Sequence, residues 1–480
     1  MAHNILFIMS DEHQQKAAGC YGHPFVHTPA IDALAANGAR FTNAYTNSPI
    51  CVPARASFAT GRAVNEIGNW DNAHPYDGQT EGWGHVLKQH GLRSLSIGKL
   101  HYRNETDPTG FDEQILPLHV VDGIGSVSAS VKQPLGPPIK TSKLATNIGP
   151  GDSGYIRYDQ SITEETCAWL KNEAPKRRNK PWVLFCSLVC PHFPLIAPPD
   201  FYDMYPHELL ETPKGSSLDY PLHPWIEKFR QVQCHDTFFT DETRKIAIAS
   251  YYALCSYMDS NVQRIMDALN ASGVRDNTLV VYTADHGENL GTRRLWGKSN
   301  MYEEAAAIPL ILSGPDVTAG KVVNTPVTLA EGANTILATL GVENSTKIDS
   351  QSWRQTANEP DNPARVAFSE YHATGADTAA YMIRKGAHKY IHYVGYGSEL
   401  FDLNADPDEQ TNLANDPEHA ATLANLQAEL THRIDPDEVN AAAQESQAAL
   451  VNLHGGRKKV LDLGSFQGTP APGEKAEYVQ

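Results

Sequence analysis

The sequence has no long hydrophobic run. Its first apolar stretch covers only residues 4–9, with no basic start and no small-residue cleavage site, unlike a secretory signal peptide. No later run approaches the roughly 18 apolar residues that a membrane-spanning helix requires. These absences predict a cytoplasmic protein that does not insert into a membrane.

Positive charge is also scarce. The chain has 39 Lys and Arg residues against 56 Asp and Glu residues, a formal net charge of -17. A protein of this charge is not expected to bind nucleic acid over its surface. An anionic substrate would need a local cationic pocket, because the field of the whole molecule repels it.

Cysteine is rare and its count is odd. Seven cysteines do not form the even set of a disulfide framework, so we expect reduced thiols. Cys186 and Cys190 lie in the apolar run LeuPheCysSerLeuValCys, which is typical of a buried strand. We therefore interpret them as core residues and not as zinc ligands.

Short apolar runs alternate with helical patterns along the chain. Predicted strands lie at residues 4–9, 93–98, 182–189 and 278–284, and predicted helices lie near 29–37 and 241–272. This alternation indicates an α/β fold with a large, mainly parallel sheet and helices on both faces. A length of 480 residues favours one such domain, residues 1–345, and a smaller second domain.

The pattern changes near residue 345. Short antiparallel strands are predicted at 380–385, 388–393 and 399–403, followed by a helix at 416–433, so we expect a smaller α+β domain over 346–436. The tail, 437–480, is either an arm that packs on another subunit or a loosely ordered terminus. Two long loops, 103–157 and 191–236, either shape a substrate entrance or only connect surface elements.

Polar side chains follow four of the predicted strands. Asp11, Lys99 and His192 each come just after a strand, and Asp285 with His286 follows another. Ligands of α/β sheets bind beyond the carboxyl ends of the parallel strands. The sequence therefore predicts that residues able to bind a charged ligand meet at one edge of the sheet.

One run of twelve residues, CysValProAlaArgAlaSerPheAlaThrGlyArg at 51–62, carries the most specific signal. The spacing after Pro53 is helical, which would put Cys51 at a helix amino terminus, where exposed N–H groups favour an anion. Arg55 lies one turn further and could reach oxygens attached to residue 51. The run resembles the signature of the type I, formylglycine-dependent sulfatases of the alkaline phosphatase superfamily.

The resemblance implies that a maturation enzyme oxidises Cys51 to formylglycine. In that family one hydroxyl of the aldehyde hydrate attacks sulfur or phosphorus, and the other expels the inorganic anion. It also implies one divalent metal ion, held by Asp11, Asp285, His286 and an oxygen of residue 51, a set suited to calcium or manganese. Many sulfatases have Asp where this chain has Glu12, so ligation by Glu12 is left open.

His286 stands where many sulfatases have asparagine, which resembles the choline sulfatase and phosphonate monoester hydrolase branches. The resemblance further implies that Lys99 and Lys298 bind the oxygens of the transferred group and that His101 handles the proton of the hydrate. The remaining residues implied are His192 as proton donor to the leaving oxygen, Asn72 as either a substrate contact or a turn residue, and His13 and Arg62 as supports.

The resemblance covers residues 4–345 and extends through 414, but not the last forty or so residues. It implies hydrolysis of aryl or alkyl sulfate monoesters to an alcohol or phenol and sulfate, by a homo-oligomer, either a dimer or a tetramer. Hydrolysis of phosphonate monoesters or phosphodiesters by the same residues is the alternative, with promiscuity between the two. A non-catalytic anion-binding protein, or one whose Cys51 stays a thiol, is the third alternative.

Overall fold

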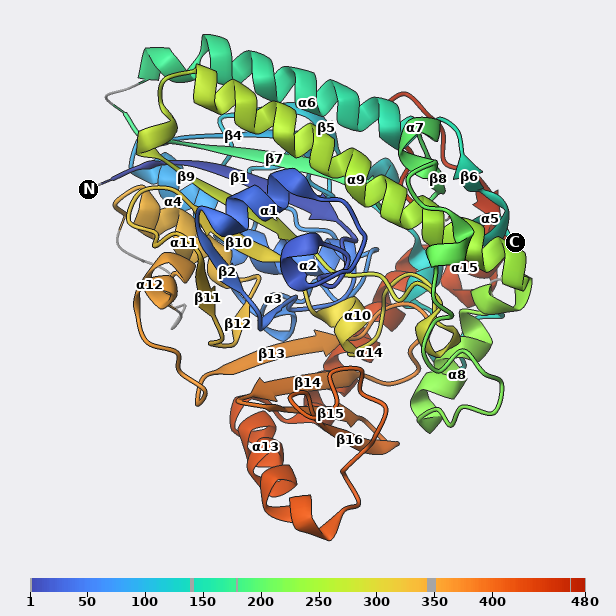
Figure 1. Cartoon of the computed structure of the whole chain (residues 1–480). Coiled ribbons are helices and arrows are strands. Elements are labelled where there is room, and N and C mark those ends of the chain that lie inside the picture. The colour runs from blue at the N-terminus through green and yellow to red at the C-terminus, as the bar shows by residue number, and fades with distance from the viewer. Residues whose placement is uncertain (1, 139–141, 178–179, 343–350, 467, 480) are drawn as a thin grey trace.

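The computed structural model describes residues 2–138, 142–177, 180–342, 351–466 and 468–479. A large sheet lies between two layers of helices, and a smaller sheet with the C-terminal helices packs against one side of this body (Figure 1). The predicted boundary between the two domains, at 345 and 346, lies outside the described residues.

The large sheet has eight strands in the order β11-β2-β10-β9-β1-β7-β4-β5. The predicted strands are β1 (Asn4–Asp11), β4 (Arg93–Lys99), β7 (Trp182–Pro191) and β9 (Thr278–Ala284). The others are β2 (Ala39–Phe41), β5 (Glu113–Leu118), β10 (Leu310–Ser313) and β11 (Lys321–Val323). Strands β9, β1, β7, β4 and β5 are mutually parallel, and only β10 runs antiparallel to its neighbours. The mainly parallel sheet is confirmed.

Both faces of the sheet are covered by helices. On one face, Leu6 and Ile8 of β1 pack beneath α1 (Pro29–Ala36), α6 (Gly154–Asn172) and α9 (Asp241–Ala271). On the other, Ile5, Phe7 and Met9 pack beneath α2 (Cys51–Thr60), α4 (Trp83–Gln89), α11 (Glu331–Thr339) and α12 (Trp353–Asn358). Burial on both faces explains why β1 is a continuous apolar run without polar alternation.

The second sheet is antiparallel, as predicted, in the order β13-β14-β15-β16. Its strands are β13 (Val366–Tyr371), β14 (Ala380–Lys385), β15 (His388–Tyr393) and β16 (Gly397–Asp402). Leu426 and Leu430 of α13 (Ala420–Arg433) cover one face. The other face packs on Tyr45 and Tyr302 of the large domain, so one apolar cluster joins the two domains.

The segments predicted as long loops contain short elements. These are α5 (Lys143–Thr146), β6 (Ile148–Pro150), β8 (Leu195–Ala197), α7 (Pro199–Tyr202) and α8 (Pro224–Val232). Short elements elsewhere are β3 (Ala44–Tyr45), α3 (Val64–Ile67), α10 (Glu303–Ala306) and β12 (Val327–Thr328). None of the described helices is both long enough and apolar enough to pass through a membrane.

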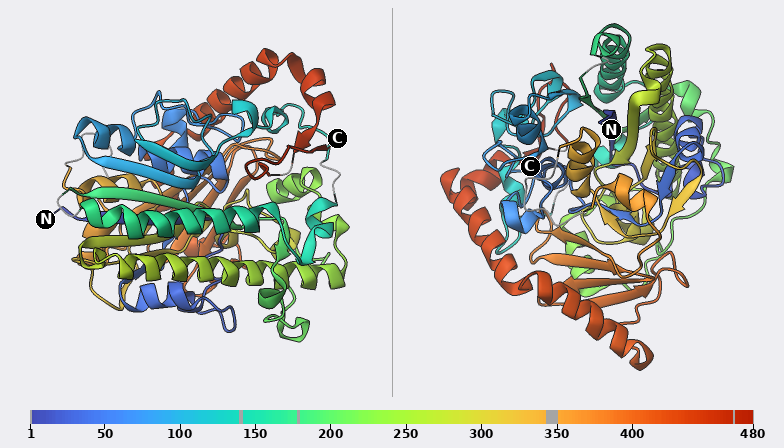
Figure 2. Two further views of the ribbon diagram at one scale, coloured as in Figure 1. Left: turned by 90° about the horizontal axis from the view of Figure 1, so that it is seen from above. Right: turned by 90° about the vertical axis from the view of Figure 1, so that its left-hand side faces the viewer.

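The tail forms α14 (Pro436–Leu453), α15 (Gly456–Leu463), β17 (Ser465–Phe466) and β18 (Tyr478–Val479). It lies against the outside of the molecule, beside earlier segments of the large domain (Figure 2). The Gln447 amide donates to Asp71 Oδ2 at 2.9 Å and to the His372 carbonyl at 2.8 Å. Val451 and Val460 pack in one cluster with Val127 and Val131. The tail is therefore docked on the large domain, and its role as an arm between subunits stays a prediction.

Candidate active site

Cys51 is the first residue of α2 and is 2% exposed. Ile50 before it is extended, and Pro53 lies in the first turn, where its missing N–H costs no intrahelical bond. The Val52 N–H donates to Asn72 Oδ1 at 3.2 Å, so Asn72 accepts from one of the backbone N–H groups that have no partner within the helix. The predicted position of Cys51 at a helix amino terminus is confirmed.

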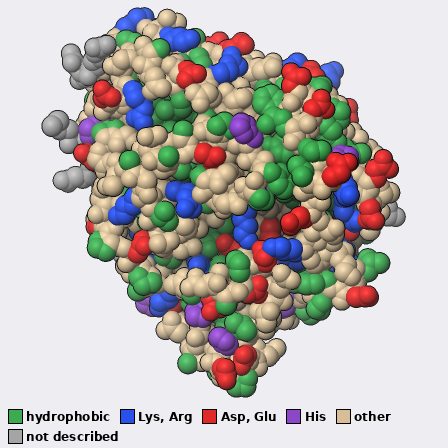
Figure 3. Space-filling view, viewed as in Figure 1, with side chains coloured by type: hydrophobic (Ala, Val, Ile, Leu, Met, Phe, Trp, Pro, Cys, Tyr) green, Lys and Arg blue, Asp and Glu red, His purple; other side chains and the backbone are tan. Residues whose placement is uncertain are grey.

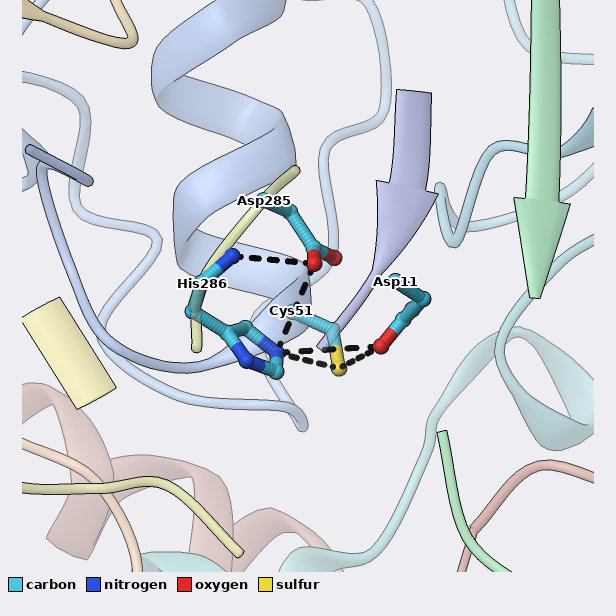
Figure 4. Close-up of side chains that lie close together, drawn as sticks. All are labelled: Asp11, Cys51, Asp285 and His286. Carbon is cyan, nitrogen blue, oxygen red and sulfur yellow. Dashed lines mark hydrogen bonds and ion pairs between the residues drawn. The ribbon is translucent and has the colours of Figure 1, made fainter. Parts of the chain in front are cut away.

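The strand-end residues meet as expected beside this helix. Asp11 ends β1, and Asp285 and His286 follow the neighbouring β9. Their side chains converge from these two strand ends on Cys51 of α2 (Figure 4). Cys51 Sγ lies 3.1 Å from His286 Nε2 and 3.7 Å from Asp11 Oδ1, and His286 Nε2 lies 3.7 Å from Asp285 Oδ1.

These four residues fit a divalent metal ion. One donor atom from each lies within 4.8 Å of the others, and all four side chains are buried. His286 Nδ1 lies 3.1 Å from the Gly287 carbonyl, which fixes the ring so that Nε2 faces the carboxylates. Carboxylates and imidazoles are common ligands of divalent metal ions.

Arg55 braces the two carboxylates. Its Nε donates to Asp285 Oδ2 at 2.8 Å and its Nη2 to Asp11 Oδ2 at 3.2 Å, while Nη1 donates to the Lys99 carbonyl and to Ser187 Oγ. The guanidinium is thus directed at the strand ends, whereas the sequence suggested contact with oxygens on residue 51. Arg55 positions the carboxylates, and Ser187, which no motif singled out, positions Arg55.

Lys99 at the end of β4 forms an ion pair with Asp11 Oδ2, and both side chains are buried. Burial alone would raise the pKa of Asp11, but Lys99, His192 and Arg55 hold it well below its usual value. Asp11 is therefore ionised and available as a ligand at neutral pH. Lys99 and Arg55 supply positive charge at this site, and both are paired with carboxylates.

Lys298 and His192 form a second group around Glu12. Lys298 Nζ donates to Glu12 Oε2 at 2.8 Å, and His192 Nε2 lies 3.3 Å from the same oxygen. Burial, followed by the charge of Lys298, lowers the pKa of His192 well below its usual value, so the imidazole is neutral at pH 7. Glu12 thus orients a lysine and a histidine that face the pocket.

Comparisons with known proteins show the family of this chain. The family model named Sulfatase matches residues 3–342. The chain belongs to the sulfatase family. A second model, N-sulphoglucosamine sulphohydrolase, C-terminal, matches residues 291–436 of this sulfatase.

Among its relatives, the sulfatase is 30% identical to the choline-sulfatase of Rhizobium meliloti over 93% of this chain and 89% of that one. It is 28% identical to arylsulfatase K of Bos taurus, over 86% and 78%. The phosphonate monoester hydrolase of Agrobacterium radiobacter has the same fold, with a TM-score of 0.71 and 20% identity over 92% and 96% of the two chains.

His101 of this sulfatase is held by a residue from the tail. Its Nε2 lies 2.7 Å from Thr469 Oγ1, and its Nδ1 has no hydrogen-bond partner among the described residues. Burial, then the charge of Lys99, lowers the pKa of His101 well below its usual value. Nothing in the sequence pointed to Thr469, because 368 positions separate it from His101 and it belongs to no motif.

The two predicted supports lie outside the pocket. His13 Nδ1 lies 2.7 Å from the Tyr282 hydroxyl and Nε2 lies 3.0 Å from the Ala17 carbonyl, and burial lowers its pKa to about 4. Arg62 accepts a hydrogen bond from Ser57 Oγ through its carbonyl, just beyond the end of α2. His13 and Arg62 therefore stabilise the framework and do not face the pocket.

The Cys51 thiol is a poor nucleophile in this environment. Burial, followed by the charge of Asp11, raises its pKa to about 12, so it stays protonated at neutral pH.

The face of the molecule in Figure 3 shows acidic and basic side chains interspersed. The pocket above Cys51 is lined by uncharged polar side chains and one lysine at this end, among them Asn72, His101, His192 and Lys298.

Proposed function

We propose that this sulfatase hydrolyses sulfate monoesters to an alcohol or phenol and sulfate, with a formylglycine made from Cys51 as the nucleophile. The observation that supports this most is the convergence of Cys51, Asp11, Asp285 and His286 at the buried amino terminus of α2. A thiol of raised pKa could not supply the nucleophile there, whereas the hydrate of an aldehyde could.

Each surrounding residue has a part in this reaction. Lys99 and Lys298 stabilise the negative charge on the sulfate oxygens in the transition state. Lys298, which is protonated and lies beside His192, passes a proton to the leaving oxygen, and His101 accepts the proton of the second hydroxyl, which then expels sulfate. Asp11, Asp285, His286 and residue 51 would hold a calcium or manganese ion, which would supply further positive charge beside the sulfate group.

The modification is tested by mass spectrometry of the peptide that contains residue 51. Exchange of the thiol group for an aldehyde removes H₂S and adds one oxygen, so the peptide should be about 18 Da lighter than its sequence predicts. The protein should be produced with and without a co-expressed formylglycine-generating enzyme. Full activity of a protein with unmodified Cys51 would contradict the proposal.

The reaction is tested by comparing kcat/KM for an aryl sulfate, an aryl phosphonate monoester and a phosphodiester. We expect the sulfate to be the best substrate and the other two to be turned over more slowly by the same residues. A preference for the phosphonate of about 100-fold, or about 2.7 kcal/mol of transition-state binding, would favour the second candidate function instead.

The metal is tested by dialysis against a chelator, followed by addition of calcium or manganese. We expect the activity to be lost and then restored, and the melting temperature to fall and recover in parallel, because the ion binds only the folded site. Unchanged activity and melting temperature after verified metal removal would contradict a metal at Asp11, Asp285 and His286.

A further inference from the structure

The pocket above Cys51 has walls of a different character from its charged floor. The cavity has a volume of about 240 Å³. Its walls carry four aromatic rings and two leucines, contributed by Phe193, Phe229, Trp296, Phe466, Leu135 and Leu461. Leu461 and Phe466 come from the tail, so the docked tail closes one side of the space that the leaving group would enter.

Packing behind the walls holds two of these rings, Trp296 and Phe229, in place. Trp296 stacks on Phe239 with ring centroids 3.8 Å apart and 6° between the planes, and its Nε1 donates to Asp236 Oδ1 at 3.0 Å. Phe229 stacks on Trp225 at 5.6 Å and 4°. The apolar surface is thus preformed, and a ligand does not have to order it.

The walls carry almost no charge. Among the described residues that line the cavity, Lys298 is the only Lys or Arg, and there is no Asp or Glu. Lys298 is already paired with Glu12 at 2.8 Å. A leaving group with a carboxylate or a second sulfate would have no cation of its own here, and a cationic one would have no carboxylate and would share the cavity with Lys298. Burying either charge unpaired is costly.

We propose that the alcohol released by this enzyme is uncharged and apolar, of the class of alkyl-substituted phenols. This rests on the proposed sulfatase function and specifies its substrate. Aromatic rings can also attract a cation, so a cationic leaving group is the main competitor, and the two classes differ in a measurable way.

The test uses four phenyl sulfates that differ only in the para substituent: hydrogen, tert-butyl, carboxymethyl and trimethylammoniomethyl. The tert-butyl and carboxymethyl groups change the acidity of the phenol little, whereas trimethylammoniomethyl withdraws electrons and improves the leaving group. The kcat/KM values are therefore compared after correction for the pKa of each phenol, so that they report the fit to the walls. With the wild-type protein we expect the tert-butyl ester to exceed phenyl sulfate by about 30-fold, since four carbons are buried. For both charged esters, kcat/KM should be about 10-fold or more below the value for phenyl sulfate.

A substitution in the wall tests whether the preference for the tert-butyl ester comes from contacts with the wall. We expect Phe466→Ala to lower kcat/KM for the tert-butyl ester by about 10-fold and for phenyl sulfate much less, because only the substituent reaches the wall. The control is Leu463→Ala, in the same segment, 62% exposed and outside the lining of the cavity, which should change neither substrate.

Two results would overturn the inference in distinguishable ways. If the carboxymethyl or trimethylammoniomethyl ester matches or exceeds the tert-butyl ester, the assigned substrate class is wrong while the sulfatase function stands. If protein with converted residue 51 hydrolyses none of the four esters, the proposed function itself fails, and the inference fails with it.

Discussion

The floor and the wall of the pocket are built in opposite ways. The floor, made of Cys51, Arg55, Lys99, Asp285 and their neighbours, comes from the ends of adjacent strands and one helix, and it is buried and charged. The wall, made of Leu135, Phe193, Phe229, Trp296, Leu461 and Phe466, comes from distant segments and is apolar. The reaction chemistry therefore depends on the floor, at the edge of the sheet, whereas the choice among sulfate esters depends on the wall.

The two regions should also respond differently to substitution. Charges of the floor act on one another in a low dielectric, so removal of one leaves its partner buried and unpaired, with a large effect on kcat. The wall contributes apolar area, whose effects are graded and smaller. The four predictions below test this division, in order of decreasing effect.

Cys51→Ala removes the precursor of the nucleophile. We expect kcat for an aryl sulfate to fall by at least about 10⁴-fold, because no neighbouring group can replace a covalent nucleophile. The control is Cys167→Ala, a partly exposed cysteine on α6 that should keep nearly full activity. A Cys51→Ala protein with an easily measured part of the wild-type kcat would show that the floor does not act through residue 51.

Lys298→Ala removes one positive charge from the edge of the floor. We expect kcat to fall by about 10²- to 10³-fold, since this charge is aimed at oxygens that become more negative in the transition state. Lys214→Ala, which breaks an exposed pair with Asp408, should change kcat less than twofold by comparison, at about the level of a surface ion pair. If only KM changed in the Lys298 variant, the lysine would contribute to substrate binding in the ground state and not to transition-state stabilisation.

Thr469→Val tests a hydrogen bond by which the tail reaches a residue of the floor. Loss of the hydrogen bond to His101 should lower kcat by about 5- to 10-fold, as expected for a neutral hydrogen bond of about 1 kcal/mol. Thr469→Ser, which keeps the hydroxyl, should restore most of the rate. Equal kcat in the wild-type and Val proteins would mean that the tail does not position His101.

His74→Gln tests how the tail is docked. His74 Nδ1 lies 2.7 Å from buried Asp71 Oδ1 and its Nε2 lies 3.3 Å from Ser446 of α14. Burial alone would lower the pKa of His74 and raise that of Asp71, but their attraction raises the first and lowers the second. The variant should lower the free energy of unfolding by about 1–2 kcal/mol near pH 6, measured by urea unfolding.

The sign of the pH dependence follows from these directions. The contribution of His74 is complete below the ordinary histidine pKa of about 6.5 and is lost as the pH rises through the raised value. The contribution of Asp71 is lost only as the pH falls below about 4. The difference between wild type and variant should therefore shrink in alkaline urea titrations. Substitution of exposed His90 is the control and should leave the free energy of unfolding nearly unchanged.

Local patterns in the sequence predicted much of the fold and of the floor. The apolar runs at 4–9 and 278–284 became β1 and β9, and the helix expected at 241–272 is α9. Strand ends of a parallel sheet lie at one edge, so Asp11, Lys99 and Asp285 could be placed together without a structure. β13 was missed, because its run ValAlaPheSerGluTyr mixes polar and apolar residues without a clear period.

The identity of the floor residues was thus determined by the sequence itself, through a twelve-residue signature and the periodicity of strands and helices. The partners of those residues were decided only by the tertiary structure. Three contacts join residues that are far apart in the chain. Arg55 donates hydrogen bonds to Asp11 and Asp285, Lys298 pairs with Glu12, and Thr469 contacts His101. Hydrogen bonds of this kind depend on packing in three dimensions, and no spacing along the sequence encodes them.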